Sequence, residues 1–142
     1  MNKRNTSAKT YIGIDYGETN IGIALGRNEL VQPLNIIPGK NSIFAAQEIT
    51  RIGMQNKVDL YVLGLPVTHD GKDTNQAKKV RKFANLLKAI SKKPVEFQEE
   101  LDSSREALEA SIELEISQKR GQHKDHLAAG IILRRYFKSL EK

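Results

Sequence analysis

Residues 10–38 read TYIGIDYGETNIGIALGRNELVQPLNIIP, and their pattern is the most informative in the chain for the fold class. Three short runs of β-prone residues are separated by GETN and GRNE, and breaks of this composition are typical of hairpin connections. The stretch therefore predicts three antiparallel strands, at about residues 10–16, 20–26 and 30–37.

Strand and helix patterns alternate in the rest of the chain. VDLYVLGLP is almost wholly apolar, as expected of a central strand covered on both faces, and Gly64 and Pro66 close it. PVEFQEE predicts another strand. A first helical pattern begins at Asn41 or Ser42. Three further helical patterns cover residues 76–93, 103–117 and 124–140. Together they predict one α/β domain whose mixed five-stranded sheet has three antiparallel and two parallel strands, with helices on both faces.

Two of these helices have a recognisable apolar face. In the first, which ends near residues 53–57, the apolar positions are Ile43, Phe44, Ala46, Ile49, Ile52 and Met54. In the second, lysines stand opposite the apolar positions Ala77, Val80, Phe83, Ala84, Leu87 and Ile90. We expect both faces to pack on the sheet.

Length and composition fit a single folded domain. The chain has 142 residues, of which 39% are hydrophobic and 28% charged, so one core can form and a second catalytic domain does not fit. We expect residues 1–9 to be a flexible basic tail and residues 10–140 to be the domain. The apolar stretch near the N-terminus is too short for a signal peptide or a membrane span.

Cysteine usage and charge narrow the chemistry. The chain has no cysteine, so a metal ion must be held by oxygen or imidazole ligands, and this usage suits the cytoplasm. With 23 Lys and Arg against 17 Asp and Glu, the net charge is +6. Such a balance favours a polyanionic partner.

Acidic residues stand at the ends of three apolar elements. Asp15 ends the first strand, Glu99 and Glu100 end the PVEFQEE strand, and Asp125 starts the last helix. Each has a plainer interpretation: a turn-binding Asp, a solvated strand end and a helix N-cap. Because neighbouring strand residues face opposite ways, one glutamate at most can point where Asp15 points. Clustered carboxylates select Mg²⁺ or Mn²⁺.

The loop from Gly64 to Gly71 is a weaker candidate site. It includes Thr68 and can present backbone N–H groups to a phosphate, but a plain strand-to-helix connection explains it equally well. The histidines are not spaced as metal ligands, and His126 is a candidate for assisting proton transfer because it adjoins Asp125. Ser103 and Ser104 are candidate helix caps.

With these residues in view, the chain resembles the YqgF/RuvX family, the Holliday-junction-resolvase-like proteins also described as pre-16S rRNA nucleases. DYGETNIGIALG is similar to the family's Asp-x-Gly-x-Lys-Arg-Ile-Gly-Val-Ala opening, and VLGLPVTHDG to its Val-Gly-Leu-Pro and Asp-Gly segment. PVEFQEELDSSREA is similar to the segment containing Asp-Glu-Arg-Leu-Thr-Thr, and KDHLAAGIILRRYF to Asp-Ser-x-Ala-Ala-x-x-x-Leu-x-x-Tyr-Leu. The order and spacing agree over nearly the whole chain.

The resemblance implies an RNase H-like fold and a metal-dependent nuclease. Asp15, Glu100 and Asp125 are then the catalytic acids that bind Mg²⁺ or Mn²⁺, and hydrolysis of a phosphodiester in an rRNA precursor or in branched DNA follows the two-metal scheme. The accessory candidates are Glu99, Thr68, Ser103, Ser104 and His126. The candidates for contacting the nucleic acid are Thr19, Asn20, Lys72, Lys78, Lys79, Arg81 and Lys82.

Two departures from the family pattern keep other functions open. Thr19 and Asn20 stand where the family has Lys-Arg, and Leu101 stands where the motif has Arg. The loss of these charges is compatible with a weak nuclease or with a non-catalytic module that binds nucleic acid in ribosome biogenesis or transcription. A remoter alternative is half of an actin-like phosphotransferase, because the first loop also resembles Asp-x-Gly-x-Thr. The sequence leaves open the choice of RNA or DNA, and of monomer or homodimer.

Overall fold

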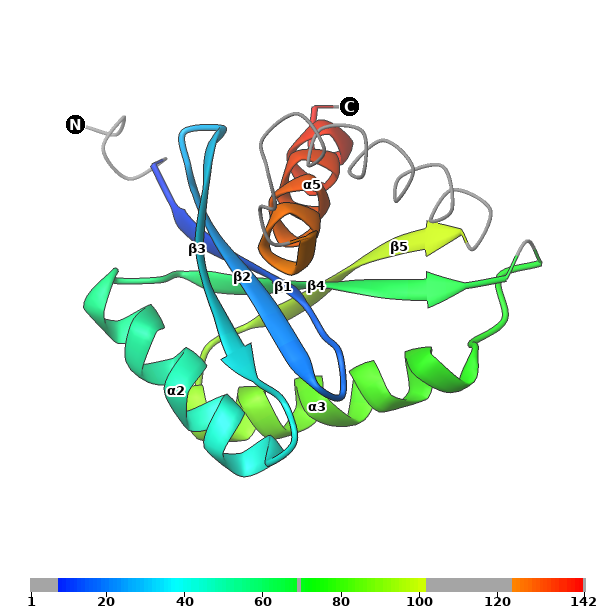
Figure 1. Ribbon diagram of the computed structural model, residues 1–142. Helices are drawn as coiled ribbons and strands as arrows, with labels where there is room; N and C mark the ends of the chain where they lie inside the picture. The colour runs from blue at the N-terminus through cyan, green and yellow to red at the C-terminus, as the bar shows by residue number, and fades with distance from the viewer. Residues whose placement is uncertain (1–7, 69, 102–123, 142) are drawn as a thin grey trace.

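The computed structural model describes residues 8–68, 70–101 and 124–141, with the backbone alone at residues 101 and 124–127. In this part of the chain, five strands form one sheet in the order β3-β2-β1-β4-β5 (Figure 1). The elements are β1 (Thr10–Asp15), β2 (Asn20–Arg27), β3 (Leu30–Pro38), α2 (Ser42–Gln55), β4 (Leu60–Val67), α3 (Asn75–Ser91), β5 (Val95–Leu101) and α5 (Lys124–Ser139). The first three strands are antiparallel, and β4 and β5 run parallel to β1, so the predicted mixed sheet is confirmed.

The sheet is covered by helices on both faces, as predicted. Helices α2 and α3 lie on one face and α5 on the other (Figure 1). Strand alternation explains the two cores: Ile12 and Ile14 belong to the core under α2 and α3, whereas the residue between them is Gly13. A Cβ at Gly13 would lie 2.5 Å from Leu133 Cγ, so the glycine lets α5 approach the backbone of β1.

The apolar face predicted for α2 is partly wrong. Ile43, Phe44 and Met54 are exposed, whereas Ala45 and Gly53 are buried. The buried residues form one narrow helical stripe, and the three exposed residues fall outside it; a small residue can occupy a core-facing position that a hydrophobicity pattern overlooks. In α3, by contrast, five of the six predicted positions are buried, and the sixth, Ile90, is partly buried against the same core.

The end of β4 was mispredicted, and two other predictions fall outside the described residues. Strand β4 does not close at Gly64 and Pro66 but continues to Val67, because β5 pairs alongside it as far as Leu101. The helix predicted over residues 103–117, and most of the predicted tail, lie outside the described residues. Among the helices described, none is long and apolar enough to cross a membrane.

Candidate functional site

Two of the three predicted acids lie on the same face of the sheet. Asp15 is the last residue of β1, one step beyond Ile14, which pairs with Leu63 of β4. Leu63 in turn pairs with Phe97 of β5, so Ile14, Leu63 and Phe97 stand at the same level of the sheet. Glu100 is three residues beyond Phe97. Because one step and three steps are both odd, the Asp15 and Glu100 side chains point to the same side, opposite to Ile14.

This shared face is the one that α5 covers. Tyr136 donates a hydrogen bond of 2.7 Å from its hydroxyl to Glu96 Oε1, and Glu96 precedes Glu100 by four residues on the same side of β5. Burial and then this hydrogen bond raise the pKa of Tyr136. Helix α5 therefore packs on the sheet face that carries Asp15 and is hydrogen-bonded to β5 on that face.

Helix α5 begins toward the Asp15 end of β1. Ala129 and Leu133 lie against Gly13, and Phe137, one turn later, lies against Gly26 beside the start of β1. The helix axis thus runs opposite to β1, and its first turn contains Asp125 and His126 at the backbone level. Convergence of the Asp125 side chain with Asp15 and Glu100 stays a prediction.

Glu100 is held by an arginine that the sequence did not single out. Its side chain is 3% exposed, and the Arg135 guanidinium Nη1 donates to Glu100 Oε1 at 2.6 Å. A carboxylate buried in this way requires a cation or several donors nearby. Arg135 supplies that charge from α5, whereas Asp15 is half-buried. The one available signal was the position of Arg135 in the helix, three residues after the buried Ile132.

Glu99 points away from this site. It alternates with Glu100 along β5 and therefore faces the α3 side, where it interacts electrostatically with Arg81. Arg81 also lies 5.3 Å from the centroid of the Phe97 ring and binds Asp73 through Nε and Nη2, at 2.6 and 3.1 Å. This hydrogen bonding lowers the pKa of Asp73. Of the two glutamates, only Glu100 thus faces the same side of the sheet as Asp15.

The basic residues predicted to contact nucleic acid are mostly engaged within the chain. Lys79 pairs with Glu18, Lys72 Nζ lies 3.9 Å from Asp70, and Arg81 is bound as described. Lys78 and Lys82 are exposed on α3, which covers the face opposite to the acids. Thr19 and Asn20 are exposed at the turn that follows Asp15.

The loop after β4 closes on itself. The backbone N–H of Lys72 donates to the Thr68 hydroxyl at 3.1 Å, and that of Gly71 donates to the Thr68 carbonyl at 2.9 Å. These N–H groups are satisfied internally, which favours the plain connection over a phosphate cradle, and Gly64 to Val67 belong to the strand. Ser103, Ser104 and His69 lie outside the described residues.

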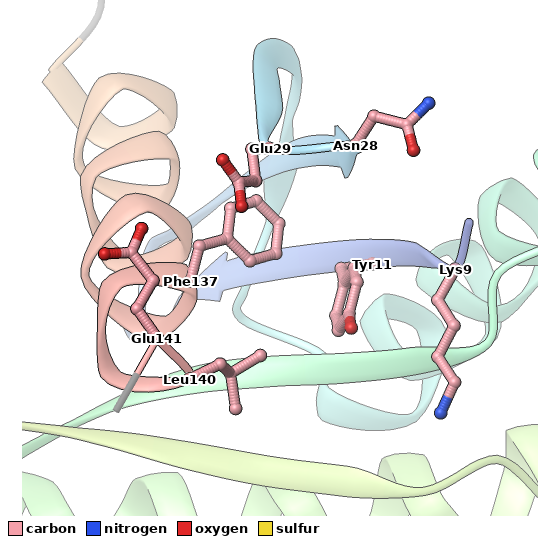
Figure 2. A pocket seen from close by; sticks show the side chains of 7 residues that line it. All are labelled: Lys9, Tyr11, Asn28, Glu29, Phe137, Leu140 and Glu141. Atoms are coloured by element: carbon pink, nitrogen blue, oxygen red, sulfur yellow. The ribbon is translucent and has the colours of Figure 1, made fainter. Parts of the chain in front are cut away.

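A separate pocket lies at the other end of β1. Its volume is about 540 Å³, and Figure 2 shows side chains from the start of β1, the β2–β3 turn and the end of α5 around it. The lining residues are Lys9, Tyr11, Asn28, Glu29, Phe137, Leu140 and Glu141. None of the predicted catalytic acids is among them, so this pocket is distinct from the candidate site.

Solved structures of low sequence identity share the fold. A Thermus thermophilus RuvC structure in complex with a Holliday junction substrate matches 92% of this chain and 96% of its own, with a TM-score of 0.56 and 12% identity. A fowlpox virus resolvase in complex with Holliday junction DNA matches 94% of this chain and 99% of its own, with a TM-score of 0.54 and 12% identity. The fold is therefore the RNase H-like fold of these resolvases.

Sequence relatives cover nearly the whole chain. A Bordetella pertussis protein named "Putative pre-16S rRNA nuclease" is 32% identical over 94% of this chain and 97% of its own length. A protein of the same name from Nitrosospira multiformis is 34% identical over 92% of this chain and 88% of its own. The family model described as RuvX, Holliday junction resolvase, matches residues 9–139. With its sheet order and these matches, the chain belongs to the RuvX family of Holliday junction resolvases.

Proposed function

We propose that this protein hydrolyses phosphodiester bonds in structured nucleic acid, with Asp15, Glu100 and Asp125 as the acids that hold Mg²⁺ or Mn²⁺. The observation that carries the proposal is the common sheet face of Asp15 and Glu100, beneath a helix whose first turn contains Asp125. Family membership supports the reaction class. The net charge of +6 supports a polyanionic substrate.

The donor chemistry of the site fits a hard divalent cation. Asp15 and Glu100 offer carboxylate oxygens, and these are the ligands that Mg²⁺ and Mn²⁺ prefer. The Arg135 bond occupies one direction at Glu100 Oε1, while a carboxylate has about four lone-pair sites. The bond therefore fixes the orientation of Glu100 without exhausting its capacity as a ligand.

Each chain residue then has a defined task. When bound, the divalent ions lower the pKa of an attacking water and stabilise the charge of the leaving oxygen. Asp15 presents its carboxylate at the end of β1, where the sheet backbone holds it rigidly. Arg135 keeps Glu100 in place and balances its charge between catalytic cycles. The scissile phosphate would lie over the sheet edge beyond Asp15.

The substrate belongs to two candidate classes. The relatives are named for pre-16S rRNA and the structural neighbours were solved with Holliday junctions, so an RNA precursor and branched DNA both merit testing. A monomer suits end trimming of RNA, whereas a two-fold dimer suits a four-way junction. We place the activity in the cytoplasm, in keeping with the absence of cysteine.

The decisive experiment is a cleavage assay on a four-way DNA junction and on precursor 16S rRNA, with Mg²⁺ or Mn²⁺. We expect wild type to cut at least one of them and Asp15→Asn and Glu100→Gln to reduce the rate by at least 100-fold, an effect typical of losing one electrostatic group at an active site. Equal cleavage by wild type and Asp15→Asn would show that the site is elsewhere.

Glu99→Gln is the matched control. It makes the same chemical change one residue away from Glu100, on the face that carries Arg81. We expect this variant to retain most of the activity. A loss as large as that of Glu100→Gln would contradict the assignment of the two glutamates.

A second candidate function has one observation in its favour. Because Arg135 already neutralises Glu100, this buried acid can be stable without a metal ion, as in a non-catalytic module that binds nucleic acid. In the same assay, tight binding of both substrates by wild type without any cleavage would select this function.

A further inference from the structure

A pair of exposed apolar residues lies at the start of α2. Ile43 is 57% exposed and Phe44 is 48% exposed, although both were predicted to face the core. The side chain of Asn41 accepts a hydrogen bond of 3.0 Å from the Phe44 N–H, so the backbone that carries Phe44 is fixed. The Phe44 ring is thus exposed to solvent on the first turn of a helix whose start is capped.

This segment is fastened to the turn that follows Asp15. The N–H of Gly39 donates to the carbonyl of Thr19 at 2.8 Å. A Cβ at position 39 would lie 2.5 Å from the carbonyl oxygen of Gly17, so only glycine permits this approach of the two backbones. The loop before α2 and the β1–β2 turn therefore lie side by side at the Asp15 end of β1 (Figure 1).

Lys40 brings a positive charge to the same surface. It is the residue after Gly39 and is exposed. Within residues 8–68, 70–101 and 124–141, it takes part in no salt bridge, in contrast to Lys72, Lys79 and Arg81. The neighbouring turn contributes the exposed, uncharged Thr19 and Asn20. Lys40 thus supplies a cation beside a turn that lacks its own.

We propose that Lys40, Ile43 and Phe44 form a nucleic-acid contact surface that binds unpaired bases next to the active site. Phe44, flanked by Ile43, offers a stacking platform for a base that has left its helix, and Lys40 neutralises an adjacent phosphate. This inference deepens the proposed function and rests on it. It also names the feature of the substrate that is recognised: a flap, loop or junction centre where stacking is interrupted.

The chemistry of the surface favours nucleic acid over a second protein chain. An exposed ring on the same segment as an exposed lysine, which forms no salt bridge among the described residues, suits a base and its phosphate, because stacking tolerates any base and the charge attracts the backbone. The surface also lies at the same end of β1 as Asp15, although α2 itself covers the opposite face of the sheet. A protein partner remains an outcome that the experiment can detect.

The test measures equilibrium binding by fluorescence anisotropy in EDTA, so that no cleavage occurs. The probes are a single-stranded oligonucleotide and a fully paired duplex of the same length, over a range of salt concentrations. The variants are Phe44→Ala, Phe44→Tyr and Lys40→Gln. Matched controls are Met54→Ala, at an exposed position near the other end of α2, and Lys57→Gln, just beyond that end.

We expect Phe44→Ala to weaken single-strand binding roughly tenfold, as the loss of one stacked base predicts, and duplex binding less than twofold. Phe44→Tyr should bind like wild type. Lys40→Gln should weaken binding to both probes and lower the salt slope by about one phosphate contact. The control variants should match wild type, and all variants should melt at the wild-type temperature because these side chains are exposed.

Identical affinities for Phe44→Ala and Met54→Ala would overturn the inference while leaving the cleavage site intact. If wild type binds neither probe, both the inference and the proposed substrate class fail. Self-association of wild type that Phe44→Ala abolishes, with unchanged nucleic-acid affinity, would assign the surface to a second copy instead.

Discussion

Arg135 Nη1 lies 2.6 Å from Glu100 Oε1, joining the C-terminal half of α5 to the end of β5. The two partners differ in environment: the glutamate side chain is 3% exposed and the arginine side chain is 38% exposed. An ion pair with one fully buried partner contributes chiefly by preventing an uncompensated charge in the interior. Arg135 is therefore both a fold-stabilising residue and a positioning residue for the proposed site.

Removing the Arg135 side chain should lower the stability of the folded protein. We predict that Arg135→Met lowers the free energy of unfolding by about 3 kcal/mol, the lower end of the range for a broken buried pair, because water partly reaches the arginine. Urea denaturation at neutral pH measures this loss. Arg134→Met is the control, since Arg134 is exposed on the same helix turn and its removal should change stability by less than about 0.5 kcal/mol. Similar losses in both variants would mean that the pair has no special role.

Divalent ions should stabilise the folded protein through the acids. At ten times the dissociation constant, binding adds about 1.4 kcal/mol, or roughly 5 °C in melting temperature for a domain of this size. We predict such a shift with Mn²⁺ for wild type and a much smaller shift for Asp15→Asn. In Arg135→Met the shift should exceed that of wild type, because the ion then also replaces the missing charge at Glu100. No shift at millimolar Mn²⁺ in any variant would argue against the metal site.

The sequence predicted the fold well where local patterns determine structure. The hairpin-joined strands were predicted because β-prone runs alternate with turn residues, and α3 because its apolar residues recur at helical spacing. The face of α2 was mispredicted because Ala45 and Gly53 are weakly hydrophobic, while Ile43 and Phe44 are strongly hydrophobic but exposed. Burial there depends on which residues meet the sheet, and that is a tertiary property.

The candidate site was predictable only in part for the same reason. Alternation along β5 was enough to show that Glu99 and Glu100 cannot both join Asp15, and the strand register identifies Glu100. The contact between Glu100 and Arg135 spans 35 positions in the sequence, and helical spacing indicates at most that Arg135 shares a face with Ile132, not that it meets Glu100. The same holds for the hydrogen bond between Gly39 and Thr19 that joins the two loops near Asp15.

Helix α2 should tolerate no side chain at Gly53. A Cβ there would lie 2.1 Å from the Tyr61 hydroxyl and 2.8 Å from Val58 Cγ1. We predict that Gly53→Ala destabilises the protein by about 1 to 3 kcal/mol despite the better helix propensity of alanine, because overpacking outweighs it. Adding Tyr61→Phe should recover part of the loss by removing the closest atom. A stabilised single variant in thermal denaturation would contradict this packing.

The Tyr61 hydroxyl should make stability fall at alkaline pH. Burial raises the pKa of Tyr61 to about 12 from 10.0, and no hydrogen-bond partner for its hydroxyl exists among the described residues. The neutral ring is therefore favoured in the folded state, so its contribution is intact below pH 10 and is lost as the pH rises toward about 12. The loss is on the order of 2 to 3 kcal/mol. Tyr61→Phe should lack this part of the loss and, below pH 10, should be as stable as wild type or more so, since an unpaired buried hydroxyl is costly.

Tyr136→Phe provides the contrast, measured by urea denaturation across the same pH series. Its hydroxyl donates to Glu96, so its removal should cost about 1 kcal/mol at neutral pH, where Tyr61→Phe costs nothing. Both tyrosines have a raised pKa, so both variants should resist alkali better than wild type relative to their own stability at pH 7. If Tyr61→Phe instead followed the wild-type decline between pH 10 and 12, ionisation of Tyr61 would not be what unfolds the protein there.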